Sequence, residues 1–486
     1  MPSANANPGS QSDGSILLPN GWRVAPAGKM LAVGTLPLNL VTSPDGRYAI
    51  ITNNGIAKPS FSIVDLANWT VKNTVPVENA FLGLAWSADG SKLYSSGGGL
   101  NNVQEFSYID GTLTRARTMA LPAKPGETLA GGVAMSRDGR TLYATRVFAM
   151  TLSSIDVASG QVSKTIALPA EPYTCIVSPD GRTVYVSLWG DRQVRGYSTD
   201  SLTETMVFRT GEHPSAMAIS ADGRRLFVAS ANSGVVNVID TFSGESLEDI
   251  STTLYPNAPR TSTPSALALS PDGNKLLVAA SDLNAIAVVD TSNSARSFVD
   301  GFIPTAWYPT GVAFSRDGKQ ILILSGKGMT PLANPLTGGS EKRLVGLLSM
   351  VPTPDRVTLA DMRIPGAGRE QKLQGRRAMS AGQTDLAPTL LALFGFDASG
   401  LAYVGRDLLG RPDGPVLRPY GEWLNSHYLF TTRATAAVCR DLTANRDVAN
   451  ACDDIDRDAR RARAISRLVV ETDLQERLRD AASVSR

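Results

Sequence analysis

Short apolar runs alternate with short polar segments along most of the chain, and one polar phrase recurs at regular intervals. The phrase is Ser-x-Asp-Gly, and roughly 42 to 50 residues separate successive copies. Apolar runs flank each copy, as at residues 216–219 and 226–229. Asp-Gly between two such runs indicates a β-hairpin, because Gly supplies the positive φ of a tight turn without a Cβ clash. The seven copies begin at Ser43, Ser87, Ser136, Ser178, Ser220, Ser270 and Ser315.

Each repeat contains sequence for four short strands. After the hairpin, a third apolar run often ends in Asp, and a fourth run leads through a Pro-containing loop to the next hairpin. A period of this length with four strands is typical of a propeller blade. We therefore predict an all-β fold, a seven-bladed β-propeller over residues 16–352 followed by a small mixed or helical C-terminal tail.

The phase of the repeat predicts how the ring closes. Residues 346–350 supply a third strand for the last blade, but Pro352 and Pro354 stop the pattern before a fourth. Residues 30–34 have the sequence of a fourth strand with no blade in front of them. We predict that this N-terminal strand completes the seventh blade, which would remove an exposed sheet edge.

Composition narrows the possible partners. The 486 residues carry a net charge of +2, from 47 basic and 45 acidic side chains, so no strong field favours nucleic acid. No run of 18 apolar residues is present, so we expect no transmembrane segment. Residues 1–15 are small and polar, which predicts a disordered lead and not a signal peptide. We expect a monomer.

The pattern changes after the last blade. Residues 353–380 are rich in Pro and Gly and are predicted to be a linker to a C-terminal part, residues 381–486. In that part, residues 384–395 predict a short helix, and residues 453–482 predict an amphipathic helix or helix pair. Cys439 and Cys452 would form a disulfide in an oxidising compartment and stay free otherwise. Cys175 lies in an apolar strand, where we expect a buried side chain.

Two resemblances to known families follow from these motifs. Ser-Pro-Asp-Gly-Arg followed by a strand and then Val-Asp or Ile-Asp resembles the YVTN-type, or YncE-like, β-propeller repeat. The lead-in Leu18-Pro19-Asn20-Gly21-Trp22 and the exit at residues 347–352 are similar to a group in which such a propeller precedes a phosphoesterase of the alkaline phosphatase superfamily. That group implies a periplasmic or secreted protein. Because this sequence shows no signal peptide, a cytoplasmic location stays open.

The tail carries the second resemblance. Thr384-Asp-Leu-Ala-Pro-Thr-Leu-Leu391, residues 405–409 and residues 420–423 resemble the end of a sulfatase-like phosphoglycerol transferase of the lipoteichoic-acid-synthase type. The catalytic core of such an enzyme is not found between these ends.

Catalytic chemistry finds little support in the sequence. Metal-assisted ester cleavage needs several Asp and His ligands, whereas the chain has two histidines, His213 and His427, and neither follows an Asp. Haem-attachment, Walker and Rossmann patterns are not found. We therefore predict no catalytic residue, no metal site and no cofactor.

The remaining candidate site is a binding surface around the channel. Loops that join one blade to the next, and loops after each second strand, should meet on one face and carry aromatic, basic and amide side chains, which suit a polar ligand or a peptide. The alternative is that these side chains only complete their loops and cover the channel mouth. The candidates are Arg146, Tyr173, Trp189, Asp191, His213, Asn232, Asp282, Trp307, Tyr308 and Lys327.

Two functions of different classes stay open. The first is a non-catalytic propeller that binds a small polar ligand or a protein partner, or serves as a scaffold. The second is an enzyme, either a metal-dependent phosphoesterase or phosphoglycerol-transferase-like hydrolase, or a propeller hydrolase such as a lactonase. The missing metal ligands favour the first, so the sequence leans against an enzyme.

Overall fold

The computed structural model describes residues 9–12, 14–18, 23–55, 57–122, 129–254, 262–329 and 345–362, and the backbone of five short strands between residues 416 and 447. The chain divides into two units, residues 1–371 and residues 372–486.

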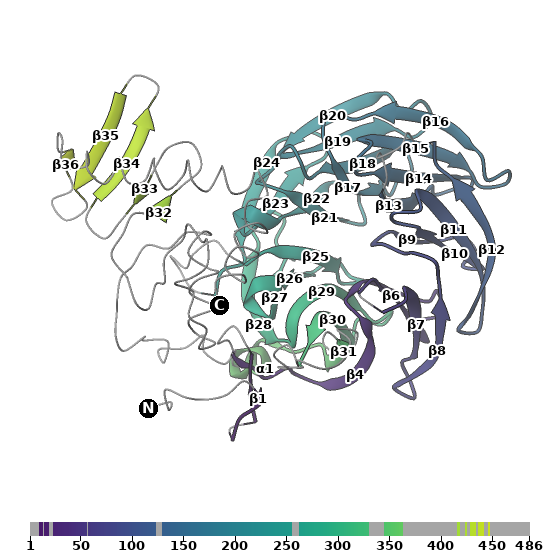
Figure 1. The fold of residues 1–486 in the computed structure, drawn as a ribbon, viewed down its shortest axis with the longest axis horizontal. Coiled ribbons are helices and arrows are strands. Elements are labelled where there is room, and N and C mark those ends of the chain that lie inside the picture. The colour runs from purple at the N-terminus through teal and green to yellow at the C-terminus, as the bar shows by residue number, and fades with distance from the viewer. Residues whose placement is uncertain are drawn as a thin grey trace, which may run out of the picture. The chain divides into compact units, whose positions relative to one another are not determined.

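The first unit is a seven-bladed β-propeller, as predicted (Figure 1). Each blade is an antiparallel sheet of four strands, and the inner strand of each faces the centre of the ring. Blades 1 to 6 use β5–β8, β9–β12, β13–β16, β17–β20, β21–β24 and β25–β28, and blade 7 uses β29, β30, β31 and β4.

The strand bounds follow the repeat closely. The inner strands are β5 (Pro37–Thr42), β9 (Leu84–Trp86), β13 (Ala130–Met135), β17 (Pro172–Val177), β21 (Pro214–Ile219), β25 (Pro264–Leu269) and β29 (Trp307–Phe314). The second strands are β6 (Tyr48–Asn53), β10 (Lys92–Ser96), β14 (Thr141–Arg146), β18 (Thr183–Leu188), β22 (Arg225–Ser230), β26 (Lys275–Ala280) and β30 (Gln320–Gly328). The third strands are β7 (Ser60–Asp65), β11 (Asn102–Ile109), β15 (Thr151–Asp156), β19 (Gln193–Ser198), β23 (Val235–Asp240), β27 (Ala285–Asp290) and β31 (Val345–Pro352). The outer strands are β8 (Thr70–Pro76), β12 (Thr112–Ala120), β16 (Val162–Ala167), β20 (Glu204–Arg209), β24 (Ser246–Ser251), β28 (Phe298–Pro304) and β4 (Lys29–Thr35).

The N-terminal strand closes the ring, which confirms the prediction from the repeat phase. Strand β4 pairs antiparallel with β31, with Leu31 opposite Leu348 and Ala32 opposite Leu347. Just before β4, Gly28 has φ +81°, and a Cβ there would lie 2.1 Å from the Met350 carbonyl oxygen. A glycine is therefore required where the chain enters this closing strand.

The core lies between neighbouring blades. Second and third strands are almost wholly buried, whereas outer strands such as β8 and β16 expose most of their side chains. Between blades 1 and 2, the rings of Phe61 and Phe106 meet edge to face at 5.2 Å and are fully buried. Burial of Cys175, which is 2 % exposed, raises its pKa to about 12, in accord with a structural side chain.

The seven Ser-x-Asp-Gly phrases form the seven hairpins between first and second strands. In every copy the Ser hydroxyl donates to the Asp carboxylate at 2.5–2.6 Å, and the backbone N–H after the Gly donates to the same carboxylate at 3.0–3.1 Å. All seven glycines have φ between +69° and +77°. These hairpins lie at one end of the blades, which we call the hairpin face.

Both ends of the chain differ in part from expectation. In the segment predicted to be a disordered lead, β1 (Gly9–Ser10) pairs with β2 (Ile16–Leu17), which pairs with β3 (Arg23–Val24). The segment predicted to be a linker includes α1 (Arg356–Asp361), which the sequence pattern did not predict. Asp355 caps this helix, and Leu359 packs against blade 6.

The described strands of the second unit form one antiparallel sheet, which was not predicted either. They are β32 (Val416–Leu417), β33 (Trp423–Leu424), β34 (Tyr428–Arg433), β35 (Ala436–Asp441) and β36 (Arg446–Asp447). The helices predicted over residues 384–395 and 453–482 lie outside the described residues, as do Cys452 and His427.

Candidate ligand-binding face

The loops after second strands meet the segments that join blades at one end of the ring. The strands of each blade alternate in direction, so these connections lie opposite the hairpin face. Backbone hydrogen bonds link the two kinds of loop: the Asn232 N–H donates to the Glu212 carbonyl at 3.2 Å, and the Asp282 N–H donates to the Ser262 carbonyl at 3.3 Å. We call this end the loop face, and all ten candidate residues belong to its loops or to strand ends that reach them.

The backbone is strained where the chain enters the inner strands from the loop face. In five blades a non-glycine residue at this point has a positive φ, and in four of these the next residue is proline. This region is costly for residues with a Cβ, and such strain concentrates at functional sites. The five residues are Leu36 (φ 42°), Leu129 (φ 83°), His213 (φ 54°), Thr263 (φ 47°) and Tyr308 (φ 63°).

A lysine and two aromatic rings form the most compact part of the loop face. The Nζ of Lys327 lies 3.9 Å from the ring centroid of Tyr308 and 5.3 Å from that of Trp307. Both distances fit cation–π attraction. Burial lowers the pKa of Lys327, and the negative charge of Asp282 opposes this shift. Burial and Asp282 both raise the pKa of Tyr308.

The neighbouring blade fixes the position of Tyr308. Its N–H donates to the side-chain oxygen of Asn284 at 2.9 Å, and Asn284 is buried in the loop of blade 6. The carbonyl of Asn284 accepts from the Thr305 N–H at 2.9 Å. On blade 4, burial raises the pKa of Tyr173, and Tyr308 raises it further.

A second aromatic pair lies on blades 4 and 5. The rings of Trp189 and His213 are 4.2 Å apart at an interplanar angle of 41°. Trp189 is 43 % exposed, whereas the Nδ1 of His213 is buried without a hydrogen-bond partner among the described residues. Nearby, Arg192 forms an ion pair with Glu212.

The other candidates are less closely grouped. Asn232 is exposed and Asp191 is partly buried, each in a loop after a second strand. Arg146 is only 4 % exposed, and its Nε donates to the Thr151 hydroxyl at 3.0 Å. Blade 3 therefore holds this guanidinium in its interior, away from open solvent.

The sequence analysis missed several residues of the loop face. Asn284 lies in a loop that the sequence analysis places on this face, but only the fold shows its bond to Tyr308 of the next blade. Exposed apolar side chains also follow the second strands of blades 2 and 3, at Leu100, Phe148 and Met150. Their position directly after a predicted second strand was the available signal.

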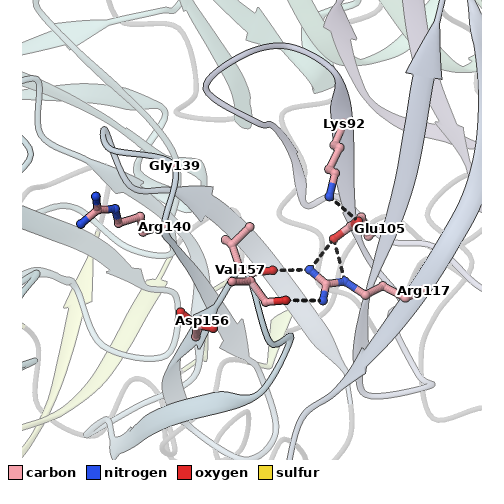
Figure 2. A pocket seen from close by; sticks show the side chains of 8 residues that line it. Lys92, Glu105, Arg117, Gly139, Arg140, Asp156 and Val157 are labelled. Atoms are coloured by element: carbon pink, nitrogen blue, oxygen red, sulfur yellow. Dashed lines mark hydrogen bonds and ion pairs between the residues drawn. The ribbon is translucent and has the colours of Figure 1, made fainter.

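A cavity of about 590 Å³ lies on the hairpin face, between blades 2 and 3 (Figure 2). The buried carboxylate of Glu105 forms ion pairs with Lys92 at 2.9 Å and Arg117 at 2.8 Å. Arg117 also donates to the carbonyls of Val157 and Ala158 on blade 3. Despite its burial, these two cations lower the pKa of Glu105. Because these groups satisfy one another, the arrangement joins two blades and offers little to a ligand.

Two observations concern metals and membranes. Across the described residues, no group of three or more His, Cys, Asp or Glu side chains could hold a metal ion. Within the same part of the chain, no helix has the length and apolar character needed to cross a membrane.

Two family profiles match the propeller. Residues 11–188 match the family described as "SMP-30/Gluconolactonase/LRE-like region". Residues 176–328 match the family described as "Lactonase, 7-bladed beta-propeller". Each match covers less than half of the chain, and both end before the C-terminal unit. They support a propeller of lactonase-like type and leave the phosphoesterase and sulfatase-like resemblances as predictions.

Individual proteins give a similar result. An uncharacterized WD repeat-containing protein of Synechocystis sp. (strain ATCC 27184 / PCC 6803 / Kazusa) is 32% identical over 186 residues, which cover 36% of this chain and 50% of the relative. The match thus spans half the length of that relative. A chain of Kuenenia stuttgartiensis hydrazine synthase is similar in structure, with a TM-score of 0.53 and 18% identity over 66% of this chain and 96% of that one. At this identity the likeness shows the fold alone.

Proposed function

We propose that this protein is a binding module that holds a small polar ligand on the loop face, at the mouth of the propeller channel. The observation that carries the proposal is the cluster of Trp307, Tyr308 and Lys327, held together by a strained backbone. Ligand sites in proteins combine aromatic walls with a few fixed polar groups, which is the composition of this cluster.

The contrast with the hairpin face supports this choice of surface. There, the polar side chains of the hairpins are hydrogen-bonded within their own turns. On the loop face, the side-chain amine of Lys327 and the phenol of Tyr308 have no hydrogen-bond partner among the described residues. Strain at Tyr308 has a cost of order 1 kcal/mol, which selection would remove unless the geometry served a purpose.

Lactone hydrolysis is a second candidate, because both family profiles belong to lactonase-like propellers. Opening a lactone requires a group that accepts a proton from the attacking water. On the described loop face, the imidazole of His213 is the candidate for that role, with the Trp189 ring packed 4.2 Å from it.

Both candidates can be tested in one screen. The full chain is mixed with a library of sugars, organic acids, amino acids, nucleotides and lactones, and ligand binding is measured as a rise in Tm. Lactone opening is followed through the acid that it releases. We expect compounds that stabilise the native chain but not Trp307→Ala. The matched control is Phe242→Ala, which changes an 83 % exposed ring between β23 and β24 on the hairpin face.

The outcomes separate the candidates. Compounds lost in Trp307→Ala and retained in Phe242→Ala support the loop face as the binding surface. Compounds lost only in Phe242→Ala contradict it. Lactone opening that disappears in His213→Ala makes the protein a hydrolase, and no opening by the native chain removes that candidate for the lactones used.

A further inference from the structure

Lys327 and the two tyrosines supply hydrogen-bond donors on the loop face. Lys327 has three N–H donors and each phenol has one O–H. No hydrogen bond or ion pair to an acceptor is formed by the side chains of Lys327, Tyr308 or Tyr173 among the described residues. The Tyr308 ring faces the ammonium only as a weak π acceptor, at 3.9 Å.

The carboxylate whose charge acts on Lys327 and Tyr308 is hydrogen-bonded elsewhere. The carboxylate of Asp282 accepts from the Thr263 hydroxyl, and it acts on Lys327 only through its charge. Thr263 is itself one of the residues with positive φ, so the backbone of blade 6 holds this pair. The negative charge of Asp282 thus offsets part of the positive charge at the channel mouth. Its carboxylate does not accept a hydrogen bond from Lys327.

Burial makes hydrogen-bond donors that lack an acceptor unfavourable in free energy. A partly buried ammonium loses hydration, and aromatic rings replace only part of it. The lowered pKa of Lys327 has burial as its largest cause, which agrees with this loss. A ligand that supplies an anionic oxygen would restore a charge-assisted hydrogen bond to the lysine.

We propose that the channel mouth binds the anionic group of a small organic acid, with Lys327 as the charged donor. The phenol of Tyr308, whose ring centroid lies 3.9 Å from the lysine Nζ, adds a neutral donor to the same anion. The ring of Trp307, 5.3 Å from the lysine Nζ, packs against the apolar body of the acid. This inference rests on the proposed function, since it names the ligand class for the same site.

Isothermal titration calorimetry on the full chain tests the inference with three probes. They are benzoate, its uncharged isostere benzamide, and inorganic phosphate. We expect benzoate to bind about tenfold or more tightly than benzamide, because a hydrogen bond to a charged group contributes more than a neutral one. Phosphate should bind more weakly than benzoate because it has no apolar body for Trp307.

Matched variants assign the effect to its residue. Lys327→Gln should remove most of the preference for benzoate, and Lys327→Arg should retain part of it. Lys319→Gln is the control, since Lys319 is exposed in the hairpin of the same blade on the opposite face. It should leave all three affinities unchanged, and thermal denaturation should show that each variant is folded.

Each outcome decides the inference separately from the proposed function. Equal binding of benzoate and benzamide, lost in Trp307→Ala, would overturn the anion site and leave a loop face that binds polar ligands. Benzoate binding that persists in Lys327→Gln would overturn the role of the lysine. Phosphate binding as tight as that of benzoate would overturn the role of Trp307. If neither benzoate nor benzamide binds, the organic-acid site is wrong, and the proposed function then depends on the compound screen alone.

Discussion

The two faces of the propeller are built in opposite ways. On the hairpin face, the same serine, aspartate and glycine make the same hydrogen bonds seven times. On the loop face, the loops differ from blade to blade, and eight of the described ones contain a non-glycine residue in a left-handed conformation, against three described loops on the hairpin face. The comparison teaches that repetition specifies the ring, whereas the loops vary between blades, which is where the proposed function places recognition.

The difference is also one of hydrogen bonding. Each hairpin aspartate accepts from its own turn, and these bonds lower the pKa of every one of the seven carboxyls. The loop face instead leaves the Lys327 amine and the Nδ1 of His213 without hydrogen-bond partners in the part of the chain that the structure describes. Under the proposed function, stability and ligand binding are divided between the two ends of the same strands.

The largest expected effect removes the scaffold that both faces share. Deletion of residues 29–35 takes away β4, the outer strand of blade 7, and exposes the edge of β31. Because an open ring presents unpaired strand edges, we expect loss of the cooperative unfolding transition and association of the chain. Circular dichroism during heating and size-exclusion chromatography measure both. A monomer that still unfolds cooperatively would contradict ring closure by β4.

A smaller effect should follow from breaking the contact between blades 2 and 3. Glu105→Ala leaves Lys92 and Arg117 without their carboxylate, and we expect a loss of about 2 kcal/mol in the free energy of unfolding. The loss is moderate because both cations reach solvent. Glu78→Ala, which removes an exposed partner of Arg115, should cost less than about 0.5 kcal/mol in the same urea titration. Equal losses would contradict the structural role of Glu105.

A single hairpin should contribute less to the free energy of unfolding than the contact between blades 2 and 3. Ser178→Ala removes the hydroxyl that donates to Asp180 and accepts from the Thr183 N–H, so we expect a loss of about 1 kcal/mol in unfolding free energy. Ligand affinity on the loop face should not change. A change in affinity with unchanged stability would mean that the two faces are not independent.

Acid should weaken the hairpins together. The folded-state pKa of each hairpin aspartate is lowered, to about 2 for Asp89, so the stabilisation is present above the usual carboxyl pKa near 3.8. It is lost as the pH falls from about 4 toward about 2, because the unfolded chain then binds protons more readily than the folded chain. Urea titrations across this range measure the slope. Asp89→Asn should flatten it, and an unchanged slope would show that this carboxyl is not shifted.

The smallest effect on stability is expected on the loop face. Trp189 is 43 % exposed, so Trp189→Ala should change the free energy of unfolding by less than about 0.5 kcal/mol. If Trp189 is part of the binding surface, the compounds found in the screen should bind more weakly. A large loss of stability would show instead that Trp189 is needed for the fold.

The sequence predicted the hairpin face well because each hairpin is local. Asp-Gly between apolar runs specifies its own turn, and the phase of the repeat was enough to pair residues 30–34 with the last blade. It did not predict β1, the helix after Asp355 or the sheet of the second unit. These short elements lack the repeat that made the blades recognisable.

The candidate site was predicted only in outline. Loop position placed Trp307, Tyr308 and Lys327 on the same face, but their contact depends on the register of β29 and β30. The bond from the Tyr308 N–H to the Asn284 side chain joins blades 7 and 6. No periodicity reports such distant contacts, since they arise only when the ring has closed.

The most direct test of the division between the faces is hydrogen–deuterium exchange of the full chain with the tightest-binding compound from the screen. We predict slower exchange in loop-face segments, at residues 210–213 and 305–310, and no change in hairpins such as residues 178–183. Protection confined to the hairpins would contradict the account and would move the binding surface to the opposite end of the propeller.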